Sequence, residues 1–191
     1  MSTKKDYESV SEEMIRDLVD RKLPWSRVKE LMSSEKDPDR FDKYIKVLEE
    51  KVPWKEKIVL PLHEHLFVVS KNGKLVVKTF CGEELGDYRE NWKLKTLVHV
   101  RETDQELEEI FPGLLKPDPE VTQLREFYCP KCGTLLDVES FPRGYPIIFE
   151  FLPDVENFYK MWLRRFIPCK GIESVMEEET QLQDKSVDVL K

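Results

Sequence analysis

Apolar side chains recur every three to four residues through the first 52 residues, a spacing that places them on one face of a helix. Ser9 and Glu12 have the spacing of a capping box at the start of the first such stretch. Asp37-Pro38 predicts an N-cap and a proline in the first turn of the last one. The strongest apolar face comprises Phe41, Tyr44, Ile45 and Leu48. We expect residues 1–52 to form an N-terminal helical segment.

From residue 53 the pattern changes to short runs of apolar and β-branched residues, which is typical of strands. Asn72-Gly73 predicts a tight hairpin turn because both residue types tolerate positive φ. An acidic stretch at 104–110 predicts a short helix. The predicted strands are 57–60, 66–69, 75–80, 93–100, 124–128 and 135–138. We expect residues 53–153 to form a β-rich core.

The last part of the chain predicts one more helix and then a tail. Asp154 is placed to cap a helix that runs through Phe158, Met161, Trp162 and Phe166, within a segment at 154–172. Residues 173–191 are polar and acidic, and we expect them to be mobile. The predicted fold class is therefore α+β, with N-terminal helices, a β-rich zinc-ribbon-like core, a C-terminal helix and a flexible tail.

Charge and composition narrow the class of protein. The 191 residues carry a formal net charge of -7, and no basic cluster is present, which argues against nucleic acid as a partner. The chain starts without the apolar segment of a secretory signal and lacks a run of about 20 apolar residues, so we expect neither export nor membrane insertion. We expect a cytoplasmic protein, whose four cysteines are then metal ligands or buried thiols rather than disulfides.

The cysteines provide the sharpest chemical signal. Cys129 and Cys132 form a C-x-x-C turn that ends in Gly133, which directs two sulfurs at one metal ion. Cys81-Gly82, at the end of a hairpin strand, is the natural source of a third sulfur. Zinc prefers four ligands, and the remaining donors near Cys81 are Glu83, Glu84, Asp87 and, farther along the chain, His99. We predict a structural zinc site formed by Cys81, Cys129, Cys132 and Asp87.

Other uses of these residues stay open at this point. The site can have lost its metal, which leaves Cys81 as a buried thiol, or Cys129 and Cys132 can act as a redox dithiol, although a pair between strands argues against that. A catalytic zinc is disfavoured because three thiolates weaken its Lewis acidity. His63-Glu64-His65 resembles part of a metal clamp, but no third ligand is evident, and we expect it to be a strand entry exposed to solvent. The sequence contains no phosphate-binding loop, dinucleotide fingerprint or G-x-S-x-G nucleophile turn.

A series of short segments, in the same order over about residues 12–166, resembles the acetone carboxylase gamma-subunit family. The segments are 37–41, 57–61, 81–82, 86–94, 98–103, 108–112, 125–135, 144–146 and 151–154. The resemblance implies a small, zinc-binding, structural subunit of an ATP-dependent, biotin-independent ketone carboxylase that joins a ketone and bicarbonate to a β-keto acid. It implies that larger hydantoinase-like partner subunits bind ATP and bicarbonate and carry out catalysis.

The sequence departs from the family pattern next to Cys81. The paired cysteines of the family's C-x-C-G become Thr79-Phe80-Cys81-Gly82, and the histidine that often follows becomes Glu83. This departure favours an aromatic-ketone enzyme such as acetophenone carboxylase over acetone carboxylase. Two rival interpretations remain, a free-standing zinc-ribbon adaptor and an independent metalloenzyme.

Overall fold

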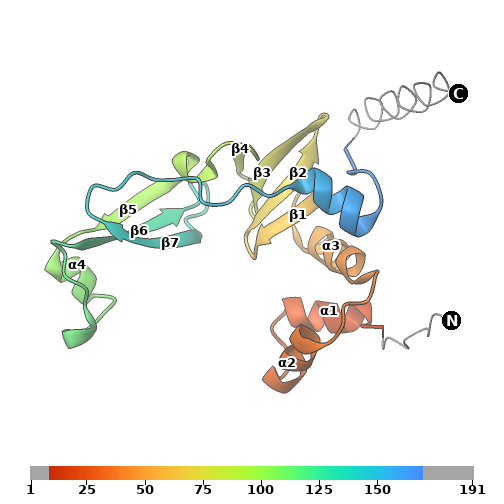
Figure 1. Cartoon of the computed structure of the whole chain (residues 1–191), viewed down its shortest axis with the longest axis horizontal. Helices are drawn as coiled ribbons and strands as arrows, with labels where there is room; N and C mark the ends of the chain where they lie inside the picture. Colours follow the sequence, from red (N-terminus) through yellow and green to blue (C-terminus); the bar gives the residue numbers. More distant parts are fainter. Residues whose placement is uncertain (1–8, 170–191) are drawn as a thin grey trace, which may run out of the picture.

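The computed structural model describes residues 9–169, apart from the side chain of Leu114, and it confirms the α+β class. Three N-terminal helices are followed by a four-stranded sheet, a three-stranded sheet and a short C-terminal helix that packs back on the first sheet (Figure 1). The acidic tail predicted at 173–191 lies outside the described residues. No helix within residues 9–169 has the length and apolar content needed to cross a membrane.

The N-terminal helices are α1 (Glu12–Val19), α2 (Trp25–Ser33) and α3 (Arg40–Lys51). Two predicted caps were wrong. Ser11, rather than Ser9, caps α1, because its hydroxyl accepts a hydrogen bond from the Met14 amide at 3.1 Å. Asp37 does not cap α3, since its buried carboxylate pairs with the Arg40 and Lys43 side chains. The apolar face predicted for α3 is confirmed, because it packs against the first sheet and the C-terminal segment.

The first sheet is an antiparallel meander in the order β1-β2-β3-β4. Its strands are β1 (Lys57–His63), β2 (Leu66–Lys71), β3 (Lys74–Thr79) and β4 (Glu84–Asp87). The hairpin turn at Asn72-Gly73 is confirmed, with φ of 50° and 76°. Strand β4 was not predicted, because its four residues show no apolar alternation and are held extended by pairing with β3.

The second sheet is also antiparallel, in the order β5-β6-β7. Its strands are β5 (Leu97–Arg101), β6 (Thr122–Tyr128) and β7 (Leu135–Pro142), with helix α4 (Asp104–Glu108) and the 3₁₀ turn η2 (Gly113–Leu115) between β5 and β6. The strand predicted at 93–100 starts only at Leu97. The Asn91 side chain accepts a hydrogen bond from the Lys93 amide and so starts the 3₁₀ turn η1 (Trp92–Lys95) instead.

The chain then returns to its first half. Residues 143–153 run back along the second sheet, and helix α5 (Val155–Asn157) continues as the π-helical turn η3 (Phe158–Leu163) beside β1 (Figure 1). The predicted cap is confirmed, because the Asp154 carboxylate accepts from the Asn157 amide at 3.1 Å. The predicted helix is too long, since the backbone turns left-handed at Arg164 and leaves Phe166 outside it. The buried Tyr159 hydroxyl donates to the Val59 carbonyl at 2.8 Å and anchors this segment.

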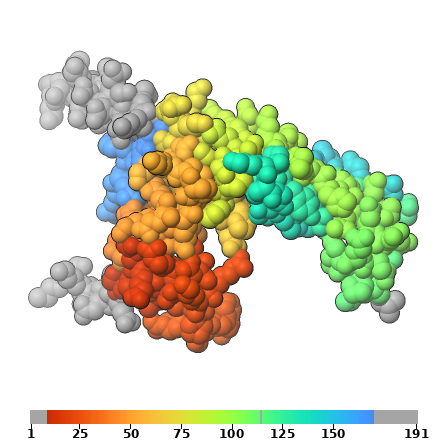
Figure 2. All heavy atoms as spheres, turned by 180° about the vertical axis from the view of Figure 1, so that it is seen from behind, coloured from red at the N-terminus to blue at the C-terminus, as the bar shows by residue number. Residues whose placement is uncertain are grey.

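The two sheets share a buried cluster where they meet. Leu66, Val77 and Leu85 of the first sheet pack in one cluster with Trp92, Cys129 and Leu136. In the space-filling view, helices α1 and α2 project from one end of the molecule. The α4 end of the second sheet projects from the other end, to the same side (Figure 2). The junction of the two sheets lies between these two projections, and the predicted cysteine site lies at this junction.

Candidate metal centre

The three predicted cysteine ligands converge at the junction of the two sheets. Cys81 follows β3, whereas Cys129 and Cys132 lie on the turn between β6 and β7. Their three sulfurs lie within 4.8 Å of one another, and the Cys81 and Cys129 sulfurs are 3.5 Å apart. Residues 48 positions apart in the chain therefore form one cluster, as the sequence pattern predicted.

Each cysteine is held by a turn with defined backbone hydrogen bonds. The Cys129 amide donates to the Thr134 carbonyl, and the Gly133 amide donates to the Cys129 carbonyl, both at 2.9 Å. Gly133 has φ of 70°, which an L side chain adopts only at a cost. On the opposite turn, Gly82 has φ of 94° and lies against Trp54, whose indole nitrogen donates to the carbonyls of residues 79 and 80.

This geometry fits zinc. A zinc ion about 2.3 Å from each of several tetrahedral thiolates holds the sulfurs about 3.8 Å apart. The observed separation of 3.5 Å between the Cys81 and Cys129 sulfurs is close to that value. All four cysteines are free thiols, and Cys169 lies in a different core cluster, so the group contains Cys81, Cys129 and Cys132 without Cys169.

A threonine hydroxyl lies beside the sulfur cluster. The Thr79 Oγ1 is 3.3 Å from the Cys81 sulfur and 3.7 Å from the Cys129 sulfur, and it accepts a hydrogen bond from the Glu83 amide at 3.0 Å. The structure therefore places a neutral hydroxyl oxygen directly beside two of the three sulfurs.

Asp87 is not brought into this group. Its carboxylate accepts hydrogen bonds from the Arg89 side chain at 2.8 and 2.9 Å, and these bonds, which outweigh burial, lower the pKa of Asp87 to about 2. Of the other donors considered, Glu84 pairs with Lys71, and His99 is exposed on β5 opposite Glu126.

Around the sulfurs is a small hollow of about 100 Å³. His65 lines it, with its ring edge-on to Phe80 at a centroid distance of 6.2 Å. The sequence pattern had not connected His65 with the cysteines, because it lies in the turn before β2, and only pairing of β2 with β3 carries it to them.

The thiols differ in how readily they ionise. Cys132 is exposed, and the hydroxyl and backbone of Thr134 lower the pKa of Cys132 to about 7. Burial raises the pKa of the Cys81 thiol, although the Thr79 hydroxyl opposes that change. A dication favours the thiolate form of all its cysteine ligands and so compensates for burial.

Comparison with known proteins identifies the family to which the chain belongs. The family model described as the acetone carboxylase gamma subunit matches residues 52–163, a range that contains the three clustered cysteines. The chain belongs to the acetone carboxylase gamma subunit family. The chain is 45% identical, over 156 residues, to the acetone carboxylase gamma subunit of Xanthobacter autotrophicus, which covers 81% of this chain and 93% of that protein.

A second relative of this chain is less similar to it. The acetophenone carboxylase beta subunit of Aromatoleum aromaticum is 30% identical over 79 residues, which are 40% of this chain and 61% of that protein. The match to the acetone enzyme's subunit is thus longer and closer than the match to the acetophenone enzyme's subunit.

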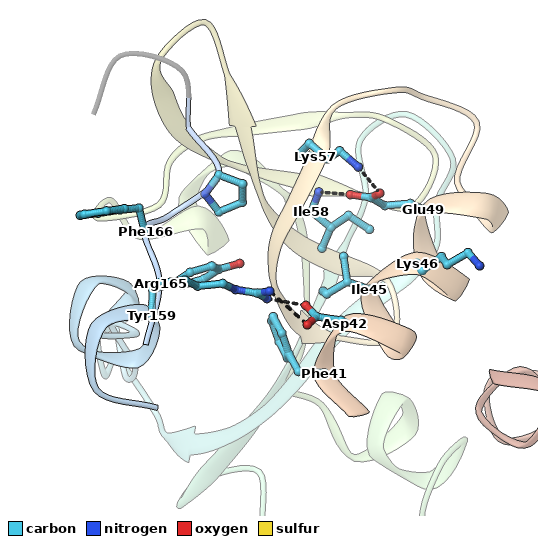
Figure 3. Close-up of a pocket in the computed structure, with 11 residues that line it drawn as sticks. Phe41, Asp42, Ile45, Lys46, Glu49, Lys57, Ile58, Tyr159, Arg165 and Phe166 are labelled. Carbon is cyan, nitrogen blue, oxygen red and sulfur yellow. Dashed lines mark hydrogen bonds and ion pairs between the residues drawn. The ribbon is translucent and has the colours of Figure 1, made fainter. Parts of the chain in front are cut away.

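A separate hollow of about 360 Å³ lies between α3, β1 and the C-terminal segment (Figure 3). Its charged side chains are already paired. Arg165 donates to Asp42, and Glu49 accepts from Lys57 at 2.8 Å and from the Ile58 amide at 3.0 Å. These hydrogen bonds connect the C-terminal segment to α3 and connect α3 to β1. The charged side chains around this hollow therefore hold the three segments together.

Proposed function

We propose that the chain is a small, non-catalytic structural subunit of an ATP-dependent, biotin-independent ketone carboxylase. In this proposal a zinc ion held by Cys81, Cys129 and Cys132 braces the junction of the two sheets. Larger hydantoinase-like subunits bind ATP and bicarbonate and join the bicarbonate to the ketone. The 45% identity to an acetone carboxylase gamma subunit over most of both chains supports this role.

The convergence of the three sulfurs is the observation that carries the structural role. Cys81 comes from the end of β3 and the other two cysteines come from the second sheet, so a shared metal ion ties the two sheets together. The same junction buries Leu66, Val77 and Leu136 in one cluster. A metal that cross-links elements in this way contributes folding free energy directly.

The surroundings of the sulfurs favour a structural over a catalytic metal. Three thiolates donate enough charge to weaken a zinc ion as a Lewis acid. Beyond the cysteines, the hollow is lined by the apolar Phe80 and Leu136, the hydroxyl-bearing Thr79 and Thr134, and one imidazole, that of His65. No carboxylate lines this hollow among the described residues, and Glu84, a donor considered above, is paired with Lys71.

The C-terminal segment offers contacts for partner subunits. Trp162 is 81% exposed, and Met161 and Phe166 on the same segment are also exposed. Aromatic and methionine side chains of this kind are enriched where proteins bind one another. We expect the larger subunits to cover this surface.

Native mass spectrometry of the complex from its own cells tests the proposal. We expect the chain to be found with large subunits and with one zinc ion. A Cys129→Ser, Cys132→Ser double variant should assemble poorly, whereas the complexes that do form should turn over the ketone at nearly the natural rate per complex. Cys169→Ala is the matched control, because this buried thiol lies outside the cluster.

Two outcomes would contradict the proposal. A double variant that assembles fully and loses only turnover would place the cysteines in catalysis. A chain that purifies without large subunits would instead favour the rival function, a free-standing zinc-ribbon adaptor.

A further inference from the structure

The three clustered sulfurs supply all but one of the ligands that a structural zinc ion needs. Zinc in such sites is almost always bound by four ligands, most often cysteine and histidine. Among the described residues, the cysteines that converge are Cys81, Cys129 and Cys132, and no carboxylate lines the hollow around them. The fourth ligand therefore has to come from another kind of side chain at this hollow.

Thr79 lies beside the sulfurs, but its hydroxyl already takes part in other contacts. Its Oγ1 accepts a hydrogen bond from the Glu83 amide at 3.0 Å and lies 3.3 Å from the Cys81 sulfur. A metal-bound thiolate has no proton, so in this pair the hydroxyl donates and the sulfur accepts. A threonine hydroxyl is also not among the usual zinc ligands. Thr79 therefore supports a sulfur ligand and does not fill the fourth position.

One imidazole lines the same hollow. His65 precedes β2, and its carbonyl accepts a hydrogen bond from the Phe80 amide at 2.9 Å, which holds it across the hairpin from the residue before Cys81. Apart from the cysteines, His65 is the residue lining the hollow whose side chain is of a type that binds zinc.

The His65 ring can turn towards the sulfurs. Its nitrogens are not part of the group of ligand atoms that lie within 4.8 Å of one another, so binding requires a change of rotamer. No hydrogen bond holds the ring among residues 9–169, and its ring contact is with Phe80, which is itself 37% exposed. The side chain can therefore move between staggered rotamers without breaking a hydrogen bond.

The neighbouring histidine lies elsewhere. His63 ends β1, its ring centroid is 6.4 Å from that of Trp92, and its Nδ1 accepts from the His65 amide at 3.2 Å. The two histidines line different cavities and do not form a clamp, because the chain turns between β1 and β2. The expected exposure of residues 63–65 is confirmed for Glu64 and was wrong for both histidines, which are partly buried.

Charge also favours an imidazole at the fourth position. Three thiolates around one zinc ion carry a net negative charge, to which a carboxylate would add and a neutral imidazole would not. The Lys131 ammonium donates to the Cys81 carbonyl at 3.2 Å and places a positive charge beside the cluster. This charge offsets the one that remains on the zinc and its thiolates.

We infer that the His65 imidazole completes the zinc site of the three cysteines, so that the ion is bound by three sulfurs and one nitrogen. This ligand would tie the start of β2 to the end of β3 and to the second sheet, and the assignment rests on the zinc ion of the proposed function.

Spectroscopy of the zinc-loaded, full-length chain tests the ligand set without any substitution. X-ray absorption should show three sulfurs at about 2.3 Å and one imidazole nitrogen at about 2.0 Å from the zinc ion. In magnetic resonance spectra of the histidine rings, zinc should shift the signals of His65. The signals of His99, which is exposed on β5, should stay unchanged.

Variants then separate a ligand from a merely nearby ring. His65→Ala should weaken zinc binding at least about tenfold, since even groups that only support a ligand contribute that much, whereas the matched His99→Ala should not. His65→Cys offers a thiolate and should restore the affinity. In a Thr79→Cys chain a fourth thiolate is present, so the further change His65→Ala should have little effect.

Three results would overturn the assignment of His65 and leave the structural zinc of the proposed function intact. They are three sulfurs and an oxygen around the zinc ion with unshifted His65 signals, equal zinc affinity of His65→Ala and the natural chain, and an equal loss from His65→Ala with and without Thr79→Cys. A natural chain that binds no zinc at all would instead contradict both the assignment and the proposed zinc site.

Discussion

Two polar clusters lie where the sheets meet, and they are completed in opposite ways. The sulfur cluster of Cys81, Cys129 and Cys132 brings three potential metal ligands together, with no cationic side chain of the described residues among them. The lysine cluster, in which Lys93 contacts Asp137, Glu139 and Glu150, supplies its own cation. These carboxylate oxygens also lie within 4.8 Å of one another, as metal ligands do, yet an ammonium already occupies the space between them. Convergence of donors therefore indicates a metal site only when no internal cation satisfies them.

The largest expected effect comes from removing the internal cation of the lysine cluster. Lys93→Met leaves the buried Glu139 carboxylate without its partner, and loss of one partner of a buried pair costs about 3–5 kcal/mol. Urea unfolding at pH 7 measures the change in the free energy of unfolding. Lys95→Met, two residues away and exposed, should change it by less than about 0.5 kcal/mol. Equal losses in the two variants would show that the cluster is not a buried cross-link.

Metal removal should have a slightly smaller effect, which is confined to the sulfur cluster. If free zinc is held at about 100 to 1,000 times its dissociation constant, binding adds about 3–4 kcal/mol of stability. A chelator should therefore lower the unfolding temperature, and added zinc should restore it. The Cys129→Ser, Cys132→Ser variant should not respond to the chelator. A response of that variant equal to the natural chain's would place the metal elsewhere.

The next prediction tests the fourth position of the sulfur cluster. Thr79→Cys should raise zinc affinity by at least about tenfold, or about 1.4 kcal/mol, because a thiolate replaces a neutral hydroxyl beside the other sulfurs. Competition with a chromophoric chelator measures the affinity, and cobalt substitution should show stronger sulfur-to-metal absorption. Thr79→Ser keeps the hydroxyl and should match the natural chain. Unchanged affinity in Thr79→Cys would mean that residue 79 lies outside the coordination sphere.

The smallest effect is expected at an exposed ion pair, which sharpens the contrast with the buried lysine cluster. Arg165→Gln breaks the contact with Asp42 that fastens the C-terminal segment to α3, as Figure 3 shows. Both side chains are about half exposed, so the loss should be at most about 1 kcal/mol. Hydrogen exchange of the amides in residues 155–163 should increase before global stability falls. A loss as large as that of Lys93→Met would contradict the distinction between exposed and buried pairs.

Much of the fold could be predicted from local patterns. The apolar stripe of α3, the Asn72-Gly73 hairpin and the Asp154 cap are short-range signals, and each is confirmed. The errors arose where distant contacts outweigh local preference. Strand β4 has no apolar alternation and exists through its pairing with β3, and the turn at Trp92–Lys95 replaces the start of a predicted strand.

The site divides in the same way. Cysteine spacing and the glycine that follows each turn were enough to predict that Cys81, Cys129 and Cys132 meet, because a tight turn directs its sulfurs to one side and a metal ion needs ligands from more than one turn. Sequence spacing also suggested Asp87, but its neighbour Arg89 binds that carboxylate. The spacing of residues along the sequence identifies possible metal ligands. It does not show which of them already binds another side chain, as Asp87 binds Arg89.

The sequence by itself determined the class of the fold, the family, and the three sulfurs that form the cluster. Only the tertiary structure showed that Thr79 lies beside those sulfurs, that Lys93 pairs with a second group of converging carboxylates, and that the Nε2 atom of His63 is buried without a hydrogen-bond partner among residues 9–169. The physical reason is the distance along the chain over which each kind of interaction acts. Turn and helix preferences act between residues a few positions apart, whereas hydrogen bonding, charge compensation and burial depend on groups that only the packing of the two sheets brings together.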